Sequence, residues 1–138
     1  MEEETDCLFV FFLSGSGNLN SYSRIQGEGV RDHRTYGEKL GKSVVDVLSD
    51  MKPVNTDTVT SHALKCEETK SPQGEPSAIP YDVVTVGDIS FVTAIYEMFD
   101  TNAMAIKENT PYEMTFVLTL TNGRGGYMPT QQCWEYGN

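Results

Sequence analysis

The fold is decided by the stretch Tyr81-Asp82-Val83-Val84-Thr85-Val86-Gly87-Asp88-Ile89-Ser90-Phe91-Val92-Thr93-Ala94. Both halves are rich in β-branched and aromatic residues, which favour strands. Gly87-Asp88 stands between the two halves, and a Gly-Asp pair between two such runs is a strong signal for a hairpin turn. The stretch therefore predicts two strands joined by a tight turn.

Three other segments have the character of strands. Leu8 to Leu13 is a continuous apolar run, as in a central strand that is buried on both faces. Thr58 to Lys65 alternates as a strand does, and Met114 to Thr121 is expected to be the last strand. Because a central strand needs neighbours on both sides, we expect Leu8 to Leu13 to belong to a larger sheet. If a neighbour is missing, the unpaired edge would promote self-association.

Two further segments are predicted to be helical. The first begins at a capping box, Thr35 and Glu38, and stops at Lys52-Pro53. The second runs from Met98 to Ile106 and is closed by Asn109-Thr110-Pro111. The expected core-facing residues are Tyr36, Leu40, Val44, Val47, Leu48 and Met51 in the first helix, and Met98, Ala105 and Ile106 in the second.

Interleaved strands and helices predict an α/β fold, in which helices pack on a mixed sheet. Residues 19–34 are polar and aperiodic and are expected to run over the surface, and residues 67–80 form a hydrophilic, Pro-rich and mobile loop. With 138 residues and 38% hydrophobic content, the chain is expected to be one globular domain or part of one.

The charge and the composition exclude several kinds of partner. A formal net charge of -10 leaves nothing to neutralise the phosphates of a nucleic acid or to bind anionic lipid. No apolar run is long enough to span a membrane, and the first six residues are acidic, unlike a signal peptide. As written, the sequence predicts a cytoplasmic protein. Its three cysteines, Cys7, Cys66 and Cys133, suggest neither a disulfide framework nor a thiolate zinc site.

Several candidate functional residues have simple structural interpretations. The loop Ser14-Gly15-Ser16-Gly17-Asn18 could hold an anion, but it lacks the Lys-Ser/Thr of a phosphate loop and no helix follows it. His33 and His62 have no partner at i+4 and are expected to be solvated surface residues. Cys133 stands beside Trp134, and we interpret it as a packed residue.

A carboxylate and a phenol are the most informative polar residues. Glu97 follows the hairpin, and Tyr127 lies in the loop after the last predicted strand. Groups delivered from strand ends can reach one cleft, where they would be ligands for a hard metal ion or acid/base groups. The alternative is a surface glutamate at a helix start and a packed tyrosine in a turn.

Three segments together resemble the neutral, non-lysosomal ceramidases and their bacterial relatives. Phe12 to Asn20 looks like the strand and active-site loop of that family. Gly87 to Glu97 looks like its Gly-Asp segment leading to Pro-Gly-Glu, and Asn122 to Thr130 looks like its Asn-x-Tyr-x-x-Tyr-[Ile/Leu/Val]-x-Thr stretch. The resemblance implies that Glu97 and Tyr127 are two of the four protein ligands of a zinc ion.

The chain also departs from the family pattern. The other two zinc ligands of the family are histidines upstream of the loop, and this sequence does not contain them. Asn20 stands where ceramidases have a serine beside the zinc, Ile95-Tyr96 replaces Pro-Gly, and Arg124 replaces the earlier tyrosine. Residues 1–138 therefore resemble the C-terminal portion of a larger ceramidase-like catalytic domain.

The resemblance implies a zinc-dependent hydrolase of amide or ester bonds, with ceramide or another lipid-like N-acyl compound as substrate. Asn20 and Tyr127 would take part in catalysis, and the loop residues Gly15, Gly17 and Asn18 would orient the substrate or bind the oxyanion. We expect no meaningful catalysis from the isolated chain. The alternative is a non-catalytic fragment or interaction module that holds no metal.

Overall fold

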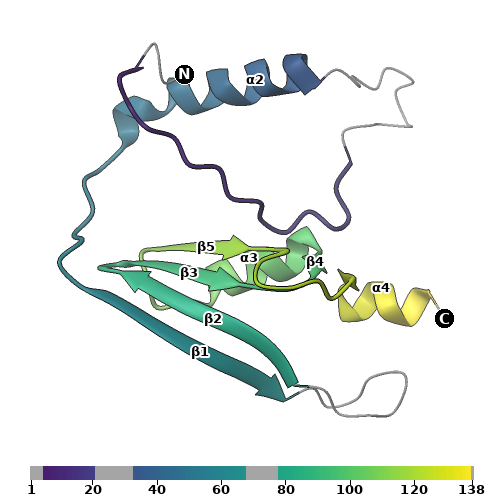
Figure 1. The fold of residues 1–138 in the computed structure, drawn as a ribbon. Helices are drawn as coiled ribbons and strands as arrows, with labels where there is room; N and C mark the ends of the chain where they lie inside the picture. The colour runs from purple at the N-terminus through teal and green to yellow at the C-terminus, as the bar shows by residue number, and fades with distance from the viewer. Residues whose placement is uncertain (1–4, 21–32, 68–77, 138) are drawn as a thin grey trace. The chain divides into compact units, whose positions relative to one another are not determined.

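The structure, a computed structural model, describes residues 5–20, 33–67 and 78–137 (Figure 1). The chain divides into two compact units. The helical unit consists of Met1–Phe11 and Asn20–Pro53, and the sheet unit consists of Phe12–Leu19 and Val54–Asn138. Most of the expected surface excursion and most of the Pro-rich loop fall outside the described residues.

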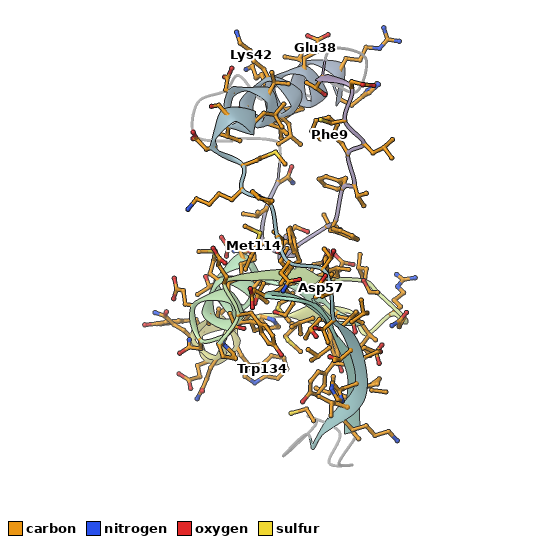
Figure 2. All side chains as sticks on the ribbon, turned by 90° about the vertical axis from the view of Figure 1, so that its left-hand side faces the viewer. Phe9, Glu38, Lys42, Asp57, Met114 and Trp134 are labelled. Atoms are coloured by element: carbon orange, nitrogen blue, oxygen red, sulfur yellow. The ribbon has the colours of Figure 1, made fainter. Side chains whose placement is uncertain are left out.

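The helical unit contains α2 (His33–Asp46) and the short 3-10 helix η1 (Leu48–Asp50). The predicted helix is therefore present, but it begins two residues before Thr35, so the expected capping box is wrong. Glu38 and Lys42 lie one turn apart on the same side of α2 (Figure 2). The apolar residues Leu40, Val47 and Met51 are all more than half exposed, contrary to the core-facing role expected of them.

The sheet unit is built on a four-stranded mixed sheet of order β1-β2-β3-β5. β1 (Val59–Glu67), β2 (Ala78–Val86) and β3 (Ile89–Thr93) are antiparallel neighbours, and β5 (Met114–Leu118) pairs parallel with β3. The predicted hairpin is confirmed, because Val86 pairs with Ile89 across Gly87-Asp88. Gly87 has φ of 54°, a conformation that glycine adopts without strain. The α/β fold with a mixed sheet is as predicted.

The chain passes from β3 to β5 through the two-residue strand β4 (Glu97–Met98) and the helix α3 (Asp100–Glu108), which packs on β5 (Figure 1). The predicted second helix is present, but Met98 belongs to β4, and Ala103 rather than Ala105 is buried. Two short elements were not predicted: β6 (Tyr127–Met128), which pairs with β4, and α4 (Gln131–Tyr136).

The expected central strand Leu8 to Leu13 is not a strand in the structure, and Leu8, Val10 and Phe11 are exposed. An apolar run becomes a strand only when a neighbouring strand satisfies its backbone groups. Its last residues do reach the sheet: the Leu13 carbonyl accepts the Thr119 amide at 2.9 Å, and the ring of Phe12 lies 5.8 Å from that of Phe91.

The buried residues of the sheet unit include a small apolar cluster and a row of hydroxyl groups. The cluster consists of Ala94, Met98, Ala103 and Val117. The hydroxyls pair between strands: Thr85 with the exposed Thr60 at 2.7 Å, and Ser90 with Thr115 at 2.6 Å. No helix among the described residues is both long and apolar enough to cross a membrane.

Candidate functional site

Glu97 and Tyr127 are direct partners in the two-stranded sheet of β4 and β6. The two strands are parallel, and Glu97 pairs with Tyr127 while Met98 pairs with Met128. Backbone bonds flank the ladder at both ends: the Glu97 amide donates to the Gly126 carbonyl at 2.7 Å, and the Phe99 amide donates to the Met128 carbonyl at 3.0 Å. Because side chains in register project from the same face of a sheet, the carboxylate and the phenol lie side by side.

The electrostatics of Tyr127 reflect this pairing. A hydrogen bond to the Glu97 carboxylate, and then the negative charge of that carboxylate, raise the pKa of Tyr127 above its ordinary value. The phenol is therefore protonated at neutral pH in the metal-free chain. A divalent cation between the two oxygen atoms would reverse this preference, because a bound cation favours the phenolate.

The loop after Phe12 packs against the backbone that carries Glu97. The Gly17 amide donates to the Met98 carbonyl at 2.9 Å. A Cβ atom on Gly17 would overlap the Glu97 carbonyl oxygen, and one on Gly15 would lie 2.6 Å from the Cβ of Ala103. β4 is thus held between this loop and β6.

Asn18 joins the loop to the start of α3. Its side-chain amide donates to the Asp100 carboxylate at 2.7 Å, and its side-chain oxygen accepts the Asp100 backbone amide at 2.9 Å. The role expected of the backbone amides of Gly15 to Asn18, to orient a substrate or bind an oxyanion, stays a prediction. The Gly17 amide and the Asn18 side chain are used to fix the loop.

An apolar cavity lies on the opposite face of β4 and β6. Its volume is about 380 Å³, and Tyr96, Met98 and Met128 line it together with Val92 and Val117. Side chains alternate along a strand, so Glu97, which lies between Tyr96 and Met98, projects away from the cavity, as does its partner Tyr127, which precedes Met128. The carboxylate and the phenol share one face, but the cavity does not open onto them.

The other residues considered from the sequence lie in several parts of the chain. Asn20 belongs to the helical unit. His33 is the first residue of α2, His62 lies in β1, and both are exposed. Cys133 is exposed and free, so its interpretation as a packed residue is wrong. Within the described ranges no three His, Cys, Asp or Glu side chains are grouped so that they could hold a metal ion.

Asn102 was missed by sequence reasoning. Its side-chain amide donates to the carbonyls of Met128 and Pro129, both at 3.1 Å, which ties α3 to the end of β6. The residue could not be singled out, because β6 is too short to be recognised in the sequence and an asparagine in the first turn of a helix is common.

Comparison with known proteins gives no relative of this chain. No family model, curated protein or solved structure matches it. What the structure adds to the sequence is an arrangement: the loop before Leu19, Glu97 and Tyr127 are neighbours, although more than 75 residues separate the loop from Glu97.

Proposed function

We propose that the chain is part of a ceramidase-like zinc hydrolase domain that cleaves amide or ester bonds, with Glu97 and Tyr127 as two of the zinc ligands. The observation that carries this proposal is the register of β4 and β6, which places the carboxylate beside the phenol. The loop of residues 14–19, the third segment of the resemblance, adjoins the same strand through Gly17. Three segments that resemble one active site thus come together.

The side chains of Glu97 and Tyr127 are both suitable zinc ligands, although two ligands do not complete a site. Carboxylate oxygen atoms are common zinc ligands, and a phenolate supplies an oxygen of the same hard kind. A stable site needs three or four protein ligands, and the described residues supply two. The remaining ligands would be the two histidines that the resemblance assigns to a segment outside this sequence. When bound, zinc would lower the pKa of a water molecule and polarise a carbonyl group.

The residues of this chain would have distinct roles at such a site. Glu97 supplies a full negative charge, and its position is fixed by backbone bonds on both sides of β4. Tyr127 is exposed on one side, so its oxygen is accessible to a substrate and could stabilise a developing oxyanion. Asn20 would take the place of the ceramidase serine as a polar group that orients the substrate.

A calorimetric zinc titration of the intact chain tests the proposal. We expect weak binding by the wild-type protein, and a loss of at least about tenfold in affinity in Glu97→Ala and in Tyr127→Phe, since the variants lack a ligand. His33→Ala and His62→Ala are the controls and should bind as the wild type does. The reverse ranking would move the site to the histidines. Absence of any binding by the wild type would favour the non-catalytic module.

A further inference from the structure

We propose that Asn102 is a positioning residue that holds Tyr127 beside Glu97. Asn102 would act through the backbone that follows Tyr127. Its amide group donates one hydrogen bond to the Met128 carbonyl and one to the Pro129 carbonyl, each at 3.1 Å. Its functional meaning rests on the proposed function, because a metal site needs its ligands at a fixed separation.

Such support matters for Tyr127 because this residue is exposed and lies on a very short strand. Its side chain is 63% exposed, so packing does not fix its direction. Its direction depends on the hydrogen bond to the Glu97 carboxylate and on the backbone of β6, which is two residues long. The pairing of β6 with β4 spans two residues of each strand, and backbone bonds from Glu97 to Gly126 and from Phe99 to Met128 flank it. A ladder this short is weak by itself, since an isolated pair of short strands is at best marginally stable.

Asn102 adds two hydrogen bonds to those between the two segments and connects them to the position of Glu97. Only three residues, Phe99 to Thr101, separate Met98 in β4 from Asn102 in α3, so the backbone runs almost directly from Glu97 to Asn102. The Met128 carbonyl, one residue after Tyr127, accepts both the Phe99 amide and the Asn102 side chain. The amide group is half-buried, and both of its protons are used.

A purely structural tie of α3 to the following segment is the alternative. The positioning role and the purely structural role can be separated, because a second asparagine, Asn109, uses its side-chain amide at the other end of α3. The Asn109 side-chain amide donates to the Ala105 carbonyl at 2.8 Å, within the helix and away from β6. Asn109→Ala therefore removes a similar bond from the same helix without touching the segment that carries Tyr127.

The test is nuclear Overhauser spectroscopy on the full chain. In the wild type, the ring protons of Tyr127 should show a cross-peak to the side-chain protons of Glu97. We expect this cross-peak to fall at least about threefold in Asn102→Ala. It should be lost in Asn102→Asp, where a carboxylate of the same shape would face two carbonyl oxygens. Asn109→Ala should keep it. An unchanged cross-peak in folded Asn102→Ala would overturn the proposal.

Two further measurements complete the test. If Asn102→Ala does not fold, hydrogen exchange with solvent is measured on the side-chain amide protons of Asn102 in the wild type. Slow exchange supports the positioning role, and exchange as fast as in an exposed asparagine overturns it. In the zinc titration, Asn102→Ala should bind about tenfold more weakly than Asn109→Ala. If the wild type binds no zinc, the proposed function fails, while the cross-peak still tests the positioning role by itself.

Discussion

Gly17 and Gly37 have opposite surroundings, although both lie in polar stretches of the sequence. A Cβ atom on Gly17 would overlap the carbonyl oxygen of Glu97, whereas one on Gly37, inside α2, would meet nothing within 4 Å. The contact at Gly17 is with backbone, which cannot move aside as the end of a long side chain can. Gly17 is therefore required by close packing of the loop on β4.

Gly17→Ala should destabilise the protein by about 1–3 kcal/mol, because the added methyl group forces the loop away from β4. Gly37→Ala should instead stabilise α2, by up to about 1 kcal/mol, since alanine is the better helix former. Urea unfolding of both variants measures the two effects. Equal stability of Gly17→Ala and the wild type would show that the loop is not packed against β4.

The Asp100 carboxylate predicts a dependence of stability on acid. A hydrogen bond from the Asn18 side chain, and then one from the Thr101 amide, hold the pKa of Asp100 below its ordinary value of 3.8. A lowered pKa means that the ionised group stabilises the fold above about pH 4, and that this contribution is lost as the pH falls through the pKa of the folded state.

Asn18→Ala should reduce this acid sensitivity, because it removes the main cause of the lowered pKa. The melting temperature should fall less between pH 5 and pH 3 in Asn18→Ala than in the wild type. Asn55→Ala is the matched control. The side-chain oxygen of Asn55 accepts a hydrogen bond from the Asp57 backbone amide, so this bond involves no carboxylate. A wild-type pH dependence in Asn18→Ala would contradict the assignment.

At the scale of the elements, a row of hydroxyl groups joins the strands from within. Ser90 on β3 is 1% exposed and shares a hydrogen bond with Thr115 on β5, and Thr115 also bonds to Thr110 at 3.0 Å. β3 and β5 are therefore coupled by side chains as well as by their backbone ladder. No buried side-chain polar atom among the described residues lacks a hydrogen-bond partner.

Thr115→Val should cost about 1–3 kcal/mol of stability, because it leaves the buried Ser90 hydroxyl without its partner. The double variant Ser90→Ala/Thr115→Val should cost less than the sum of the two single changes, since both hydroxyls are then gone. Chemical denaturation of the two single variants and the double variant completes a double-mutant cycle, which measures the interaction free energy of the two hydroxyls. Strictly additive costs would show that the two hydroxyls do not interact.

The long elements could be predicted from the sequence, and the short ones could not. The hairpin at Gly87-Asp88, the strand after Thr58 and the helix before Asn109 follow from local patterns and turn chemistry. β4 and β6 consist of two residues each and exist only because they pair with one another. The prediction of a strand at Leu8 to Leu13 is wrong for the converse reason. Its apolar pattern fits a strand, but a strand also needs a neighbouring strand.

The same limit applies to the candidate site. Glu97 and Tyr127 could be singled out by residue type and resemblance, and their adjacency agrees with that expectation. The roles of Gly17, Asn18 and Asn102 could not be predicted, because each depends on a partner between 26 and 82 residues away in the sequence. A single sequence gives no measure of such contacts.

At the scale of the whole molecule, the sheet unit has apolar side chains on both faces of its sheet. One face carries the rings of Phe91 and Phe116, stacked 5.2 Å apart with Phe12 beside them, and the other carries Val92 and Val117. The edges of the described sheet are β1 and β5. A sheet of this kind is stable when both faces are covered and its edges are protected.

We therefore expect the isolated 138 residues to be marginally stable and to self-associate. Sedimentation should show association that increases with salt, because salt screens the repulsion between chains with a net charge of -10. A sharp unfolding transition from a strictly monomeric sample would contradict both expectations.

The alternation of side chains along β4 and β6 makes the length of these segments more critical than their composition. A one-residue insertion or deletion just before Glu97 would turn Met98 outwards and direct the carboxylate into the apolar cavity. A buried, unpaired carboxylate is far more costly than an exposed substitution. Point changes at positions 97 and 127 should therefore leave the fold intact, while insertions and deletions in the preceding loops should not be tolerated.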